Sequence, residues 1–502
     1  MIKNEKIDLA ILLLISLLLS IYLFFRTYVI SLDGAFQYIP IAKDIVSGLY
    51  GKALAHNQQP LYSFLVALVS RWVSDYELAG KLVSTIFGIL IIFPVYFLGK
   101  RIFDERVALF SSFFLAIHPY IRRFSADVLK ESTYLFLFAT AIWFAWRTIQ
   151  GEKKYLYLFI PLLSALAYLV RPDGVEILIG VFLYVLFIKK FSASKERCTI
   201  ILFLFLSSAL LFLPYLIHLK EITGVWTLSR AKTISGFLGL GGMGDEVSIY
   251  YKILFSLKKL NTEIFSIYHP LYIFLLVIGL LKRRFSHFRT GEGFLFLFCA
   301  LHYVVLFLLV LNITEWGGKE MTRAVHFSGR HVLPLLLFSV YWVGEGFLTI
   351  YQWILKKAES HRLPLYLGSN RKSAIVFVTL LILILAIVLP KTLKPQRYER
   401  LPEKWAGVWI KNQSGQGAKI FTTMPRVAFY ADGECEHIDF KRDKSDRIET
   451  LMTEKKAQYF VIRGRETIDY PQEIGFIEKH FAEAICFEEK GMEKIVVYRR
   501  GS

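Results

Sequence analysis

The sequence is poor in charged residues and in cysteine. Only 20% of its 502 residues are charged, whereas 55% are hydrophobic and 16% are aromatic. Soluble globular chains carry about a quarter charged residues, so this composition excludes a set of ordinary soluble domains. The four cysteines stand far apart, which excludes a CxxC-type zinc site and a disulfide-dense scaffold. No internal repeat is evident, and this argues against a secondary transporter, because many transporters contain repeated halves.

What the sequence has instead is a series of long apolar runs. They predict an all-α polytopic membrane protein with about eleven transmembrane helices. Two shorter amphipathic segments, 36–46 and 60–73, are predicted to lie along the membrane surface. The predicted spans are 7–25, 78–98, 107–118, 128–146, 155–170, 175–188, 199–218, 270–281, 294–312, 332–355 and 374–389.

The distribution of Lys and Arg predicts the orientation. The net charge of +19 would suit a nucleic-acid partner if the basic residues formed one patch. They gather instead in alternate loops, at 3–6, 100–106, 147–154, 189–197, 282–289 and 356–372. Cytoplasmic loops are enriched in Lys and Arg. We therefore expect an integral protein of the cell or plasma membrane with a cytoplasmic N-terminus, and we exclude nucleic acid as a partner.

The last part of the chain has a different character. Residues 391–502 contain nearly equal numbers of basic and acidic residues and no long apolar run. Helix-like segments at 403–412 and 442–456 alternate with strand-like segments at 419–422, 458–462, 483–487 and 494–498. The sequence therefore predicts a transmembrane domain, 1–390, followed by a small extracytoplasmic α/β domain, 391–502.

Asp33 follows the first predicted span by about eight residues and precedes an amphipathic segment. An aspartate at this place can cap the helix that follows. It can equally be a catalytic carboxylate held at the membrane surface. Position alone leaves both interpretations open.

Two further groups of polar residues fall in predicted outer segments. His56, with Gln59 and Tyr62, precedes or opens the second surface segment, where such residues can simply face water. Asp127 and Glu131, four residues apart with Lys130 beside Glu131, either form an acidic first helical turn or complete an acidic site with Asp33.

Arginines follow or precede two other spans. Arg171 and Asp173 belong to an Arg-Pro-Asp-Gly sequence after the fifth span, and Arg330 and His331 precede the tenth. Guanidinium groups at a membrane surface reach lipid phosphate, or they bind a phosphate carried by a lipid substrate. The glycine-rich stretch 239–244, in a predicted outer loop at 219–268, lacks the Lys-Ser/Thr of a phosphate-binding loop and is interpreted as a flexible connection.

Taken in order, these residues resemble a known family. Asp33, the Gln-Pro-Leu-Tyr segment at 59–62, the His-Pro before Asp127 and Glu131, and the arginine motifs resemble those of polytopic GT-C glycosyltransferases. More narrowly, the chain is similar to the dolichyl-phosphate-mannose protein mannosyltransferase and aminoarabinose transferase family. Gly34 follows Asp33 where many relatives have a second acid. The stretch before Pro60 also lacks the Glu-Lys pair of aminoarabinose transferases.

The resemblance implies an enzyme that moves a sugar from a polyprenyl-phosphate donor to an acceptor on the non-cytoplasmic face. Asp33 would be the general base, with Asp127 and Glu131 as further candidate catalytic acids. The resemblance leaves the acceptor open among protein, lipid and glycan, and it leaves a divalent metal ion open as a cofactor. A lipid flippase or small-solute transporter is the alternative. The candidate residues for the donor phosphate and substrate are His56, Gln59, Tyr62, Lys130, Arg171, Asp173, Arg330 and His331.

Overall fold

The structure, a computed structural model, describes residues 5–152, 154–188, 194–230, 248–283, 290–313, 327–360, 369–440, 443 and 445–501. The chain divides into two compact units. The first comprises Met1–Tyr22 and Ile41–Leu393, and the second comprises Leu23–Pro40 and Lys394–Ser502. The assignment of Leu23–Pro40 to the same unit as the C-terminal residues was not expected from the sequence.

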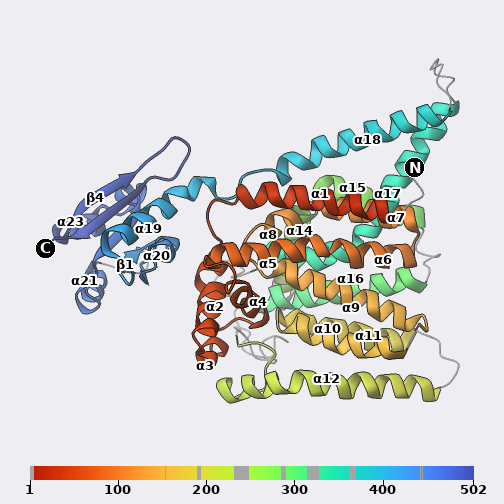
Figure 1. Cartoon of the computed structure of the whole chain (residues 1–502), viewed down its shortest axis with the longest axis horizontal. Helices are drawn as coiled ribbons and strands as arrows, with labels where there is room; N and C mark the ends of the chain where they lie inside the picture. Colours follow the sequence, from red (N-terminus) through yellow and green to blue (C-terminus); the bar gives the residue numbers. More distant parts are fainter. Residues whose placement is uncertain are drawn as a thin grey trace. The chain divides into compact units, whose positions relative to one another are not determined.

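Helices make up nearly all of the described chain before residue 393 (Figure 1). The α-helices are α1 (Glu5–Phe25), α2 (Ile39–Val46), α3 (Tyr50–Leu54), α4 (Leu61–Val69), α5 (Tyr76–Leu90), α6 (Ile92–Ile102), α7 (Glu105–Ile117), α8 (Pro119–Ser125), α9 (Glu131–Ile149), α10 (Phe159–Tyr168), α11 (Glu176–Leu183), α12 (Ser194–Thr223), α14 (Ile249–Tyr268), α15 (Pro270–Arg283), α16 (Thr290–Ile313), α17 (Leu333–Ser360) and α18 (Ser369–Thr392). Short 3-10 or π turns are η1 (Gly34–Tyr38), η2 (Lys154–Leu158), η3 (Pro172–Val175), η4 (Tyr184–Ile188) and η6 (Gly329–Val332).

The described helices confirm a polytopic membrane protein. Six helical stretches, one of them α5 continued by α6, are long and apolar enough to span a bilayer, and the pair α14 and α15, bent by 99°, would make a seventh. Several predicted spans correspond to shorter helices, such as α7 with 13 residues and α10 with 10. A helix needs about 20 residues to cross the hydrocarbon layer. The count of eleven spans therefore stays a prediction.

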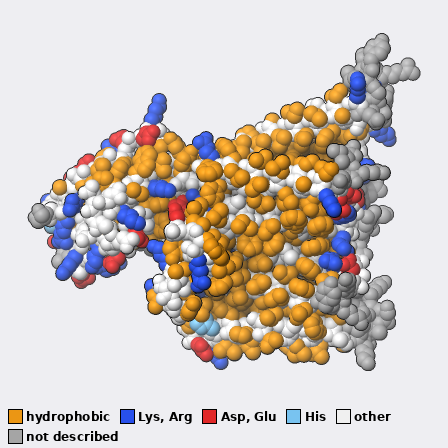
Figure 2. Space-filling view, viewed as in Figure 1, with side chains coloured by type: hydrophobic (Ala, Val, Ile, Leu, Met, Phe, Trp, Pro, Cys, Tyr) orange, Lys and Arg blue, Asp and Glu red, His pale blue; other side chains and the backbone are white. Residues whose placement is uncertain are grey.

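The outer surface of the helical unit is hydrophobic. Figure 2 shows apolar side chains across its visible face, with charged side chains gathered toward the ends of the helices. Large apolar residues such as Leu18, Phe205, Leu210 and Ile382 are more than half exposed. Water would oppose this exposure, whereas lipid tails do not. The exposed residues therefore mark the surface that faces lipid.

Close helix packing holds the helical unit together, most extensively between α15 and α17. A Cβ atom added at Gly279 would lie 1.9 Å from the carbonyl oxygen of Trp342 on the facing helix. One added at Gly346 would lie 1.9 Å from the carbonyl oxygen of Leu275. Small residues at such contacts let two backbones approach closely.

The prediction of an outer loop at 219–268 is partly wrong. Helix α12 continues to Thr223, and 249–268 form α14, which has an amphipathic sequence with several lysines. The charged residues lower the mean hydropathy of this segment below that of a predicted transmembrane span. The chain then turns at His269, whose φ is +66°. The glycine-rich stretch 239–244 lies outside the described residues.

The second unit contains a five-stranded sheet in the order β2-β1-β3-β5-β4. Strands β1, β2 and β3 are parallel, and β5 runs antiparallel to both β3 and β4. The strands are β1 (Lys419–Thr422), β2 (Glu434–His437), β3 (Tyr459–Arg463), β4 (Phe481–Phe487) and β5 (Ile495–Arg500), and the helical segments are η7 (Tyr398–Arg400), α19 (Leu401–Ser414), α20 (Arg426–Ala431), α21 (Ser445–Glu454), α22 (Glu466–Asp469) and α23 (Pro471–His480). This confirms the predicted small α/β domain.

Both faces of the sheet are covered by helices. One buried cluster joins residues of α19 and α20, such as Ile410 and Val427, to Ile420 and Val461 of the sheet. The other joins residues of α21 and α23 to the opposite face, with Phe460 at its centre. A parallel sheet needs cover on both faces, and these helices provide it.

Candidate active site

Asp33 lies in the segment Leu23–Pro40 of the second unit, directly before the turn η1. The Oγ atom of Ser31 accepts a hydrogen bond from the N–H of Gly34 at 3.1 Å, and the carbonyl of Ser31 accepts one from Ala35. The Asp33 side chain, which is half-buried, makes no capping hydrogen bond to this turn. Ser31 therefore closes the turn, and the capping interpretation of Asp33 finds no support in the geometry.

Arg171, Asp173, Glu131 and Arg330 form a charged cluster in the helical unit, which we call the arginine cluster. Arg171 is ion-paired with Asp173. The Nε atom of Arg330 lies 3.8 Å from Oε1 of Glu131, the first residue of α9. The side chains of Arg171 and Glu131 are only 6% and 2% exposed. The sequence places these residues in three separate segments, and the fold brings them together.

Neighbouring charges shift two pKa values in the arginine cluster. Burial lowers the pKa of Arg171, but the carboxylates of Asp173 and Glu131 outweigh burial and leave that pKa raised. Burial likewise raises the pKa of Asp173, but Arg171 and two nearby histidines leave it lowered. Arg171 also lies 4.9 Å above the ring of Tyr134, whose face attracts a cation. The positive charge of Arg330 partly offsets this rise in the pKa of Arg171.

His331 follows Arg330 in η6, and two buried side chains hold its backbone. Oε2 of Glu176 lies 2.7 Å from Nδ1 of His302, and Nε2 of His302 lies 2.9 Å from the carbonyl oxygen of His331. The side chains of His302 and Glu176 are 1% and 5% exposed. His302 therefore fixes the backbone that carries Arg330. Neither His302 nor Glu176 was predicted from the sequence, although a histidine inside the apolar run 294–312 was a usable signal.

Asp127 and Tyr62 are fully buried in the helical unit. Oδ1 of Asp127 accepts from the N–H of Val128 at 2.8 Å, and the hydroxyl of Tyr62 lies 2.8 Å from Oγ of Ser84. The same Ser84 hydroxyl donates to the carbonyl of Leu129. The contacts of Ser84 join α4, α5 and the turn before α9.

Lys130 and Gln59 are also almost fully buried and hydrogen-bonded. Nζ of Lys130 lies 2.6 Å from Oε1 of Gln58. Nε2 of Gln59 lies 3.4 Å from the carbonyl oxygen of Leu228. Gln59 therefore connects the start of α4 to the segment after α12.

His56 pairs with an acid that the sequence analysis did not single out. Its Nε2 atom lies 3.1 Å from Oδ2 of Asp44, whose other oxygen is 2.8 Å from Nζ of Lys52. Burial raises the pKa of Asp44, but Lys52 and His56 outweigh burial and leave it lowered. Within the described part of the chain, no group of three or more His, Cys, Asp or Glu residues could hold a metal ion.

Residues 57–218, about a third of the chain, match the family model described as dolichyl-phosphate-mannose-protein mannosyltransferase. ArnT from Cupriavidus metallidurans, solved with undecaprenyl phosphate, matches at a TM-score of 0.58 and 12% identity, over 98% of this chain and 97% of ArnT. The chain has the GT-C fold. No curated protein sequence matches it significantly.

Two other GT-C structures show the same likeness. The archaeal oligosaccharyltransferase AglB from Archaeoglobus fulgidus, in complex with an inhibitory peptide and a dolichol-phosphate, matches at a TM-score of 0.57 and 14% identity, over 99% of this chain and 74% of AglB. The mycobacterial arabinofuranosyltransferase AftD matches at a TM-score of 0.50 and 13% identity, over 98% of this chain and 41% of AftD. The family match and the GT-C fold confirm the predicted class of enzyme, a glycosyltransferase.

Proposed function

We propose that this GT-C protein transfers a sugar from a polyprenyl-phosphate donor to an acceptor hydroxyl on the non-cytoplasmic face, with Asp33 as the general base. The observation that carries the donor class is the arginine cluster. The cluster contains two guanidinium groups that interact electrostatically, a buried one on Arg171 and a partly exposed one on Arg330, and guanidinium groups suit the oxygens of a phosphate. The dolichol-phosphate bound to AglB and the undecaprenyl phosphate bound to ArnT support the same donor class.

The proposed reaction is a single displacement. The acceptor oxygen forms a bond to the anomeric carbon while its proton passes to the carboxylate of Asp33. The bond between the anomeric carbon and the phosphate oxygen breaks, and its electron pair leaves with the polyprenyl phosphate. Arg171 and Arg330 stabilise the negative charge that grows on the phosphate. His302 and Glu176 hold the turn that carries Arg330.

The first prediction concerns Asp33→Asn. The change keeps the shape of the side chain but removes the base, so turnover should fall at least about a hundredfold while donor affinity and thermal stability hold. The measurement uses the purified full chain, a panel of labelled polyprenyl-phosphate sugars, and a cell-envelope extract as the source of acceptor.

The matched control is Asp75→Asn at the start of α5. Asp75 is a true N-cap, because its side chain accepts from the N–H groups of Glu77 and Leu78. Asparagine caps about as well as aspartate, so this variant should keep normal turnover. Near-normal turnover of Asp33→Asn would remove Asp33 from the mechanism and make Glu131 the next candidate base.

A flippase or transporter is the second candidate, and two observations favour it. Helices α14 and α15 are broken by a 99° bend, and the helical unit buries the ionisable pair of His302 and Glu176. Broken helices and buried ionisable groups are common in transporters. The test follows a labelled lipid-linked sugar in proteoliposomes. Movement between the two leaflets without transfer of the sugar would support a flippase and contradict the proposed transferase.

A further inference from the structure

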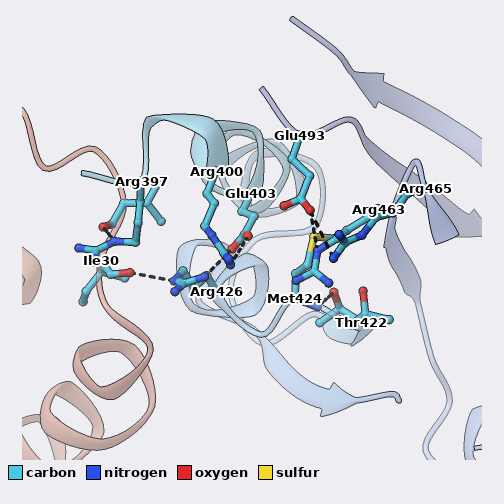
Figure 3. A network of polar contacts seen from close by, with 12 residues as sticks. Ile30, Arg397, Arg400, Glu403, Thr422, Met424, Arg426, Arg463, Arg465 and Glu493 are labelled. Carbon is cyan, nitrogen blue, oxygen red and sulfur yellow. Dashed lines mark hydrogen bonds and ion pairs between the residues drawn. The ribbon is translucent and has the colours of Figure 1, made fainter. Parts of the chain in front are cut away.

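The segment that carries Asp33 is bound to the sheet domain by several side chains, all within the second unit (Figure 3). Nε of Arg426 donates to the carbonyl of Ile30 at 2.8 Å. The hydroxyl of Tyr430 accepts from the N–H of the same Ile30, also at 2.8 Å. Both polar backbone groups of Ile30, three residues before Asp33, are therefore held by α20.

Two more contacts extend this attachment toward the start of the segment. Nε of Arg397 donates to the carbonyl of Val29 at 2.6 Å. Gln396 pairs with Thr27 through an isolated β-bridge and through its side-chain amide, at 2.8 Å from Oγ1 of Thr27. On the other side of Asp33, η1 packs against α20. The chain is thus fixed both before and after the carboxylate.

Arg426 is itself held firmly. It is almost fully buried, and its Nη1 atom lies 3.2 Å from Oε2 of Glu403, whose side chain is fully buried. Burial lowers the pKa of Arg426, and the charge of Glu403 opposes that effect. Arg400 reaches the other oxygen of Glu403 at 3.4 Å (Figure 3). A buried charge with good partners keeps one geometry, because leaving it unpaired is costly.

We infer that the sheet domain positions Asp33 for transfer, with Arg426, Tyr430 and Arg397 as positioning residues. This inference rests on the proposed role of Asp33 as general base. Each extended residue spans about 3.3–3.6 Å, so a segment released at Ile30 could carry the carboxylate several ångströms away. A misplacement of about 1 Å can reduce a reaction rate about a hundredfold. The function of the sheet domain would then be to hold the base, in addition to any contact with the acceptor.

The test uses the full chain and the double variant Arg397→Gln with Tyr430→Phe. These changes remove contacts to Val29 and Ile30 but leave the buried pair of Arg426 and Glu403 intact. Turnover should fall about tenfold to a hundredfold with donor affinity unchanged. Amide hydrogen exchange should rise in residues 28–36 and stay unchanged in β1 and β3. Lys455→Gln, which removes an ion pair with Glu436 of β2, is the matched control and should change neither readout.

A second variant, Arg426→Met with Glu403→Gln, removes the contact of Arg426 to Ile30 without leaving a buried charge alone. It should show the same pattern of exchange and activity. Faster exchange at 28–36 with normal turnover would overturn the inference, and so would unchanged exchange in both variants. The outcome for Asp33→Asn is separate: if that variant is fully active, the proposed base is wrong, whatever the anchoring variants show.

Discussion

At the scale of residues, the structure distinguishes the candidate acids by their burial and their partners. The sequence predicted Asp33 as the base, with Asp127 and Glu131 as further candidate acids in outer segments. Asp127 is fully buried and bonded to the adjacent backbone, whereas Glu131 meets Arg330, and Asp33 sits beside a turn that Ser31 closes. Sequence position could place these acids near a membrane surface. Sequence position could not predict the burial or the partners of these acids, because both depend on segments that are distant along the chain.

Asp44 gives a prediction on pH at this scale. Its pKa is lowered in the folded protein because Lys52 and His56 outweigh burial. Such an acid adds stability above its unfolded pKa, about 3.9, and this stability is lost as the pH falls through the folded value. The thermal unfolding temperature of the wild type should therefore fall more steeply below about pH 4 than that of Asp44→Asn. Parallel pH curves for the two proteins would contradict the assigned pairing.

At the scale of elements, the apolar helices were predictable and the amphipathic or short elements were not. The span predicted at 78–98 appears as α5 and α6, and the strand predicted at 419–422 is β1. Helix α14 was missed because its lysines lower its hydropathy, and β2 was missed because this short edge strand has the polar sequence Glu-Cys-Glu-His. The segment Leu23–Pro40 contacts residues of the sheet domain that are about 400 positions away in the sequence. No local sequence pattern could predict such a contact.

The contact of α15 with α17 gives the prediction at this scale. Gly346→Ala places a methyl group against the backbone of Leu275, so the two helices must separate. Overpacking of this kind costs about 1–3 kcal/mol of the free energy of unfolding, measured by thermal or denaturant unfolding in detergent. Gly293→Ala in α16 is the control, because no atom lies within 4 Å of its added Cβ. Equal stability of the two variants would show that the close approach is not required.

At the scale of the whole molecule, the hydrophobic surface of the helical unit and the distribution of its basic loops suggest an orientation. The proposed mechanism needs Asp33, Arg171 and Arg330 on the same side of the membrane. All three fall in segments that the Lys and Arg bias assigns to the outer face. The number of spans decides whether residues after 393 share that face, and an odd number places them there.

The last prediction tests this orientation directly. Fusions of a reporter that is active only outside the cytoplasm are made at residue 152, in a basic loop, and at residue 450, in α21. We expect a signal at 450 and none at 152, because basic loops are retained on the cytoplasmic side. Removal of the basic residues near 152, Arg147, Lys153 and Lys154, should weaken the retention and raise the signal there. An active reporter at 152 with an inactive one at 450 would show that the protein has the opposite orientation in the membrane. Arg171 and Arg330 would then face the cytoplasm, and the donor would have to be used on that side.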